Sequence, residues 1–155
     1  MSKKHFLNTC KPGEGRITYD QNYDIKSHKH EIETAKWIVR KFGGHIHLMT
    51  EDKSKDHEKI SNPDYLWRGK WWELKGTKSV SGISKRLEIA ISQINNNPIF
   101  KAGGIIIDVT GTKLNKNDIT AVTRRRLSES TKANMIVIIK KEDEVIDVIS
   151  SKKKK

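Results

Sequence analysis

The chain alternates between helical and strand patterns of apolar residues once past residue 27. From Ser27 to Phe42 apolar residues recur three or four positions apart, which is the spacing of one helix face. The pair Gly43–Gly44 follows directly, and glycine commonly ends a helix. Similar spacing predicts a second helix over Ser84–Asn96, and a third is expected over Asn117–Ser130.

Strand patterns occupy the segments between these helices. Residues 45–49 alternate, and Tyr65–Trp67 and Trp71–Lys75 read as a hairpin about Arg68–Gly69. Nearly continuous apolar runs at 104–109 and 135–139 predict two strands that are buried on both faces. An alternating segment at 144–149 predicts the last strand. The resulting order, α-β-β-β-α-β-α-β-β, predicts one α/β domain with a central mixed β-sheet flanked by helices.

The remaining segments are polar and set the expected domain limits. A length of 155 residues suits one domain, which we place at residues 28–150. Residues 1–27 are expected to form a flexible N-terminal arm, and residues 151–155 a disordered basic tail.

Charge is the strongest global property of the chain. Thirty-one Lys and Arg residues against 19 Asp and Glu give a formal net charge of +12, which attracts polyanions such as nucleic acid. A basic surface that meets an acidic protein partner is the alternative. The single cysteine excludes an intramolecular disulfide, and no apolar run is long enough to span a membrane. A cytoplasmic site of action is therefore expected.

The predicted hairpin brings three charged residues together. If its turn contains two residues, Asp64 lies directly opposite Glu73, and alternation places Glu73 and Lys75 on one face. Two adjacent carboxylates repel each other unless a cation compensates them, and Mg²⁺ prefers such oxygen ligands. A metal, two carboxylates and a lysine are suited to phosphodiester hydrolysis. A solvated hairpin face is the simpler interpretation of an isolated Glu-x-Lys.

Other polar residues allow two interpretations. Glu31 lies near the apolar face of the first helix, so it either turns toward this site or is a half-exposed residue favoured by the helix dipole. Beyond the hairpin, Lys78, Ser79, Lys85 and Arg86 either contact phosphate or form a helix cap and solvated charge. The pairs His28/His30 and His45/His47 raise a zinc site or a histidine-based ribonuclease as weaker alternatives.

These residues resemble a known nuclease motif. Pro63–Asp64, followed after eight residues by Glu73–Leu74–Lys75, is similar to the PD-(D/E)XK motif of restriction-endonuclease-like nucleases. The sequence of the hairpin, together with that of the predicted helix from Glu31 onward, resembles the C-terminal tRNase domain of contact-dependent growth inhibition toxins. The resemblance covers about residues 28–150, although its specific part is the hairpin.

The resemblance implies a restriction-endonuclease-like fold and Mg²⁺-dependent cleavage of nucleic acid. Asp64 and Glu73 would bind the metal, Lys75 would be the catalytic lysine and Glu31 an auxiliary acid, with Gln93 as a further polar site residue. The toxin branch implies tRNA as substrate, a cognate immunity protein and delivery within a larger secreted toxin. A DNA endonuclease of the same fold and a non-catalytic nucleic-acid-binding module remain the alternatives.

Overall fold

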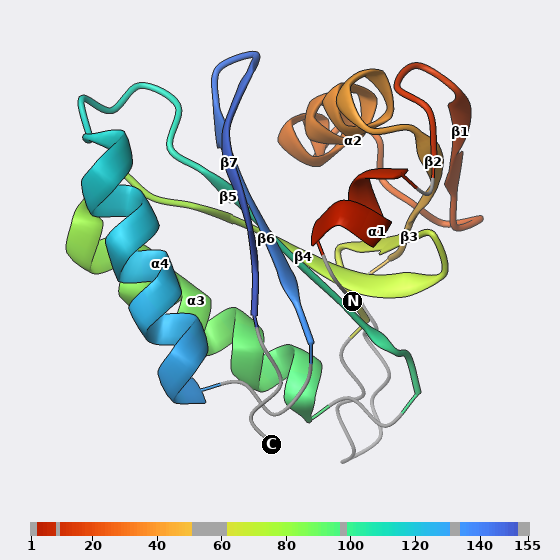
Figure 1. Cartoon of the computed structure of the whole chain (residues 1–155). Helices are drawn as coiled ribbons and strands as arrows, with labels where there is room; N and C mark the ends of the chain where they lie inside the picture. Colours follow the sequence, from red (N-terminus) through yellow and green to blue (C-terminus); the bar gives the residue numbers. More distant parts are fainter. Residues whose placement is uncertain (1–2, 9, 51–61, 97–98, 131–133, 152–155) are drawn as a thin grey trace.

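The computed structural model describes residues 3–8, 10–50, 62–96, 99–130 and 134–151. This part of the chain forms one seven-stranded mixed sheet in which the strands lie side by side in sequence order, from β1 to β7 (Figure 1). The strands are β1 (Gly15–Tyr19), β2 (Gly44–Leu48), β3 (Tyr65–Trp67), β4 (Lys70–Gly76), β5 (Ala102–Asp108), β6 (Ile136–Lys141) and β7 (Glu144–Ser150). The helices are α1 (Lys3–Asn8), α2 (Lys29–Lys41), α3 (Val80–Asn95) and α4 (Lys116–Ser130).

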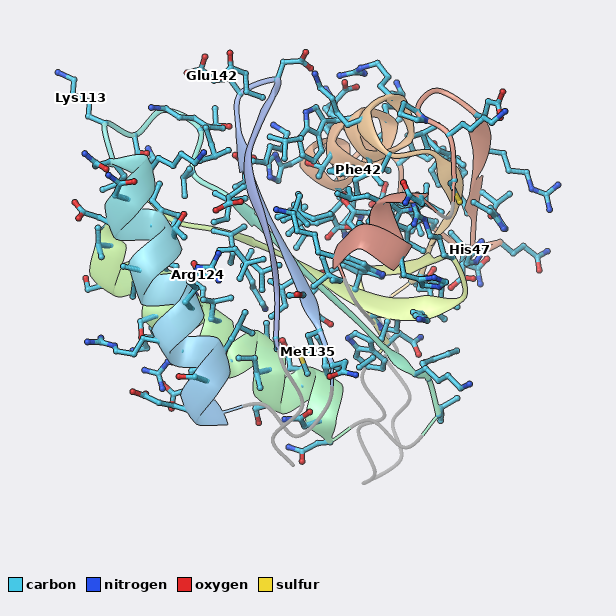
Figure 2. The ribbon with its side chains drawn as sticks, viewed as in Figure 1. Phe42, His47, Lys113, Arg124, Met135 and Glu142 are labelled. Carbon is cyan, nitrogen blue, oxygen red and sulfur yellow. The ribbon has the colours of Figure 1, made fainter. Side chains whose placement is uncertain are left out.

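Helices cover both faces of the sheet. The pair α3 and α4 lies on one face, and α1 and α2 lie on the other (Figure 1). Each face has its own hydrophobic core, and β5 contributes Ile105 and Ile107 to the first and Ile106 to the second, as alternating strand residues must. Figure 2 shows the side chains that fill the space on either side of the sheet. This arrangement confirms the predicted mixed α/β domain.

The pairing of strands brings several strand ends together at one edge of the sheet. Strands β4, β5 and β6 are mutually parallel, so their carboxyl ends meet at the same edge of the sheet. The antiparallel strand β3 begins at that edge, because it pairs with β4 through the hairpin. Residues at the start of β3 and at the ends of β4, β5 and β6 are therefore neighbours, although they are far apart in sequence.

The first 27 residues differ from the expected flexible arm. Lys3–Asn8 forms α1, whose Phe6 is fully buried, and Gly15–Tyr19 forms β1, which pairs in parallel with β2. At the other terminus Ser151 is buried and donates through Oγ to Met135 O at 3.3 Å, while the expected basic tail, 152–155, lies outside the described residues.

Candidate active site

The β3–β4 hairpin has the turn that the sequence predicts. Trp67 pairs with Lys70, so the turn contains Arg68 and Gly69 alone. Both residues have positive φ, 55° and 75°, which is the backbone of a type I′ turn. One step beyond the last pair of β3, this register places Asp64 opposite Glu73.

The two carboxyl groups are in contact; Glu73 is shielded from solvent, and Asp64 is half-buried. Asp64 and Glu73 hydrogen-bond to each other through their side chains, and Glu73 is only 3% exposed. Glu73 Oε1 also accepts a hydrogen bond of 2.6 Å from Trp71 Nε1, while Asp64 Oδ2 accepts one of 2.8 Å from the backbone nitrogen of Leu74. Both acids are thus held in fixed positions by the strand that carries Glu73.

Burial controls the ionisation of this pair. Loss of hydration, followed by the charge of Asp64 and the hydrogen bond with it, raises the pKa of Glu73 to about 9. The Trp71 hydrogen bond and the nearby charge of Lys75 act in the opposite direction but are outweighed. Without a bound cation the pair therefore shares a proton at neutral pH.

Lys75 extends the site along the same strand. Its Nζ lies 4.0 Å from Glu73 Oε2, and its side chain is 21% exposed, so the ammonium group borders solvent beside the buried Glu73. Trp72 and Leu74 pack into the core on the α1 and α2 side, whereas Trp71 packs toward α3 and α4. The alternation of β4 is therefore the one expected, with Glu73 and Lys75 close together.

Glu31 lies at the beginning of α2, near the same edge. Its Oε2 accepts a hydrogen bond of 2.7 Å from the hydroxyl of Tyr23, and its carbonyl oxygen accepts one of 2.6 Å from the hydroxyl of Tyr65. Burial and the Glu31 contact raise the pKa of Tyr23, and the charge of Asp64 adds to the shift. Glu31 thus belongs to the surroundings of Asp64, with its carboxylate bonded to a tyrosine.

The other predicted site residues are spread along α3 and its start. Ser79 is the N-cap of α3, where its Oγ accepts a hydrogen bond of 3.0 Å from Gly82 N. Lys85 and Arg86 are exposed on the same helix. The buried Oε1 of Gln93 has no hydrogen-bond partner among the described residues.

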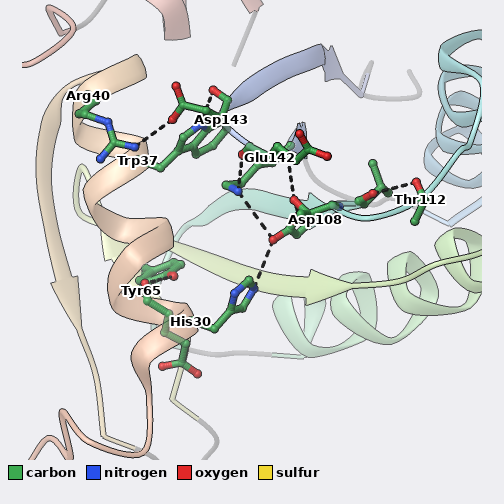
Figure 3. Close-up of polar contacts among 12 residues, drawn as sticks. His30, Trp37, Arg40, Tyr65, Asp108, Thr112, Glu142 and Asp143 are labelled. Carbon is green, nitrogen blue, oxygen red and sulfur yellow. Dashed lines mark hydrogen bonds and ion pairs between the residues drawn. The ribbon is translucent and has the colours of Figure 1, made fainter.

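A second polar cluster, which sequence reasoning missed, lies at the carboxyl ends of β5 and β6 (Figure 3). Asp108 is almost fully buried, and its Oδ2 lies 3.4 Å from His30 Nε2 and 3.8 Å from Lys140 Nζ. Its Oδ1 accepts hydrogen bonds from the backbone nitrogen and the hydroxyl of Thr110, at 2.9 and 2.5 Å. The one signal in the sequence was an aspartate at the end of a continuous apolar strand.

Two pockets open beside this cluster, and His30 lines both. One has a volume of about 340 Å³ and is lined by His30, Gly76, Thr77, Lys78, Asp108 and Thr110. The other, of about 280 Å³, lies between α2 and the β6–β7 turn. Lys78, a candidate for nucleic-acid binding, therefore faces a cavity next to the predicted site.

The side chains of the site differ in how well they fit Mg²⁺ and Zn²⁺. Two carboxylates suit Mg²⁺, which binds one or two carboxylates and completes its shell with water and substrate phosphate. Across the residues that the structure describes, no three His, Cys, Asp or Glu side chains form a metal-binding group. His45 and His47 instead each form a hydrogen bond with Thr18 Oγ1, both at 2.7 Å. The described residues therefore do not form the zinc site that was one interpretation of the histidine pairs.

The comparisons with known proteins give the family. Residues 61–145 match the family described as the contact-dependent growth inhibition CdiA C-terminal domain. The match includes the hairpin, Asp108 and Lys140. No curated protein and no solved structure matches the chain. No helix in the described part of the chain has the length and apolar character needed to cross a membrane. Since the match spans more than half of its residues, the chain belongs to the family of contact-dependent growth inhibition CdiA C-terminal domains.

Proposed function

We propose that this chain is a toxin domain that cleaves RNA, with tRNA as the leading substrate, at a Mg²⁺-dependent site formed by Asp64, Glu73 and Lys75. The observation that carries the proposal is the buried carboxyl group of Glu73, hydrogen-bonded to the half-buried Asp64, with the ammonium group of Lys75 4.0 Å away. A structural role alone does not account for a buried glutamate in contact with a second acid, because desolvation of Glu73 and its repulsion by Asp64 oppose folding.

The residues of the site fit a hard divalent cation. The oxygens of Asp64 and Glu73 would hold it in place of the proton that they share without metal. When bound, the metal supplies a polarised phosphate and a water molecule of lowered pKa. The proposal of a restriction-endonuclease-like active site, which the PD-(D/E)XK resemblance implies, depends on these two acids binding the metal.

The remaining groups of the site have separate tasks. The ammonium group of Lys75 stabilises negative charge that develops on the phosphate during cleavage, or orients the attacking water. Trp71 holds one oxygen of Glu73, which fixes the direction of the other. Glu31 accepts the hydrogen bond of Tyr23, whose hydroxyl is influenced by the charge of Asp64, so we place Glu31 as a positioning residue.

RNA is preferred over DNA because of the resemblance of the hairpin to tRNase domains of this toxin class. The same residues would serve a DNA endonuclease, which is the second candidate. Membership of the family supports action of the domain as a part of a larger secreted toxin, and an immunity protein that blocks the site. With a net charge of +12, an acidic inhibitor is the expected complement.

The test compares cleavage of purified total tRNA and of plasmid DNA by the protein with Mg²⁺ and with EDTA. Asp64→Asn, Glu73→Gln and Lys75→Ala are each expected to reduce the rate by at least about 100-fold while the protein still folds. Glu144→Gln, which changes an exposed acid on β7, three strands away from β4 in the sheet, is the matched control and should keep full activity. Full activity of any of the three site variants, or in EDTA, rejects the mechanism.

Two further outcomes separate the alternatives. Cleavage of plasmid without cleavage of tRNA assigns the domain to DNA. Tight binding of either nucleic acid without cleavage under any metal condition assigns it to the non-catalytic binding modules.

A further inference from the structure

The pocket at the carboxyl ends of β4 and β5 begins one residue beyond Lys75. Gly76, which follows this lysine on β4, pairs with Asp108 on β5, and both residues line the pocket. The backbone nitrogen of Thr77 donates to Asp108 O at 3.1 Å, so the pairing of β4 and β5 continues to the base of the pocket. At about 340 Å³ the pocket is at the lower end of the range of small-molecule sites, and α/β sheets bind ligands at such strand ends.

Most polar groups in the pocket already have partners. The carboxylate of Asp108 accepts two hydrogen bonds from Thr110, and the ammonium group of Lys140, 3.8 Å away, compensates its charge. The hydroxyl of Thr110 donates to Asp108 and accepts from Glu142 N at 2.7 Å. The hydroxyl of Thr77 is bonded to the backbone of Ser79. The pocket is therefore not arranged to bind a cation.

Two groups remain available to a ligand. The carboxylate of Asp108 favours a proton on His30 Nε2, and in the neutral ring this leaves Nδ1 as a hydrogen-bond acceptor. The His30 side chain is 64% exposed. Within the described residues, neither His30 Nδ1 nor Lys78 Nζ has a hydrogen-bond or ion-pair partner. The two side chains that carry this acceptor and this ammonium group line the same pocket, beside the proposed cleavage site.

We propose that this pocket binds one ribonucleotide unit of the RNA substrate, with the ribose 2′-hydroxyl donating to His30 Nδ1 and the phosphate paired with Lys78 Nζ. The proposal rests on the proposed function, because it takes the bound strand to continue from the cleavage site. The 2′-hydroxyl is the group by which a protein distinguishes RNA from DNA. Asp108 is the positioning residue, since it fixes the proton and the orientation of the imidazole.

The experiment measures binding separately from cleavage. Fluorescence anisotropy in EDTA follows a labelled RNA pentanucleotide and a series in which each ribose in turn is replaced by 2′-deoxyribose. We expect the protein to lose about fivefold in affinity at one position of the series, the effect of one net hydrogen bond. His30→Ala should abolish this position-specific loss, whereas Lys78→Ala should weaken every member of the series equally.

Controls test whether the effect belongs to this pocket. His45→Ala removes an exposed histidine on β2 and should keep the position-specific loss. Asp108→Asn should reduce it, because the amide cannot hold the proton on Nε2 as a carboxylate does. If His30→Ala fails to fold, Lys78→Ala still tests the proposal, since unchanged affinity for the whole series in that variant overturns it.

The outcomes for the pocket and for the proposed function are distinguishable. Wild-type protein that cleaves tRNA but binds all members of the series equally overturns the pocket alone, as does a loss that survives in His30→Ala. Discrimination without any cleavage overturns the proposed function and retains the pocket. Displacement of the pentanucleotide by AMP is expected of this pocket, whereas equal displacement by inorganic phosphate at the same concentration overturns recognition of the ribose.

Discussion

At the scale of single residues, Glu73 links stability to pH. Its pKa rises from an ordinary 4.5 to about 9 on folding, because of burial and the neighbouring Asp64. Between these values the folded protein holds a proton that the unfolded chain has released, so metal-free stability is fully present below pH 4.5 and falls as pH rises toward 9.

The variant Glu73→Gln removes this titration and should flatten the dependence. We expect the urea midpoint of the metal-free wild type to decrease between pH 5 and pH 9 by clearly more than that of Glu73→Gln, with Glu144→Gln behaving as wild type. Saturating Mg²⁺ should restore wild-type stability at pH 9, since the cation replaces the proton. Parallel curves for wild type and Glu73→Gln would show that Glu73 ionises normally.

The proposed active site could be predicted from the sequence because the features that place its residues act over short stretches of chain. Turn length fixes the register of a hairpin, and strand alternation fixes the face, so Asp64, Glu73 and Lys75 could be placed together from a dozen residues. His30, Asp108 and Lys140 come from three distant segments. The parallel pairing of β5 and β6 places Asp108 opposite Lys140, and the position of α2 on the sheet adds His30; no local pattern specifies either arrangement.

At the scale of elements, the sequence predicted the helices and strands from α2 onward, whereas it did not predict α1 and β1. The three predicted helices correspond to α2, α3 and α4, although α3 begins at Val80, four residues earlier than the spacing indicates. Ser79 sets that start as an N-cap. The helix α1 and the edge strand β1 have only six and five residues and lie within a polar stretch, so neither period stood out there.

Phe6 shows how the short helix α1 is held. Its ring lies 5.2 Å from Trp67 and 5.6 Å from Trp72, and the guanidinium group of Arg68 sits 4.4 Å above it. We expect Phe6→Ala to lower the free energy of unfolding by about 3–5 kcal/mol, as measured by urea denaturation. The neighbouring Leu7→Ala changes a side chain that is 39% exposed and should stay within about 0.5 kcal/mol. Equal effects of the two variants would mean that α1 is not docked.

Two glycines allow a matched test of the sheet. A Cβ at Gly104 on β5 would lie 1.9 Å from the carbonyl oxygen of Ile136 on β6, so the strands would have to separate. A Cβ at Gly69 in the hairpin turn meets nothing within 4 Å, and only its positive φ of 75° opposes a side chain.

We expect Gly104→Ala to lower the free energy of unfolding by about 3 kcal/mol or more, from overpacking against backbone. Gly69→Ala should lower it by only about 1–2 kcal/mol, the cost of a left-handed conformation. Chemical denaturation of both variants measures the difference. A reversed order would contradict the close approach of β5 and β6.

At the scale of the whole molecule, the net charge of +12 is distributed unevenly between paired and free side chains. Arg40 and Lys41 pair with Asp143, and Arg126 lies near Glu88, so these cations are partly compensated. Lys113 instead extends away from the body of the domain (Figure 2). Lys85 and Arg86 are exposed on α3 and have no acidic partner among the residues described.

This distribution predicts a salt dependence that can be assigned to one helix. If RNA is bound through about six phosphates, its affinity should fall roughly 10³-fold between about 50 and 200 mM salt. Each phosphate contact adds nearly one counterion to the slope, so Lys85→Gln with Arg86→Gln should reduce the slope of log affinity against log salt by about 1–2. The control Lys36→Gln with Arg40→Gln removes the same charge from cations that pair with Glu33 and Asp143, and should leave the slope nearly unchanged. Equal reductions in the two double variants would mean that only the net charge attracts RNA. A reduction confined to the α3 pair would extend the RNA-binding surface from the end of β4 along this helix.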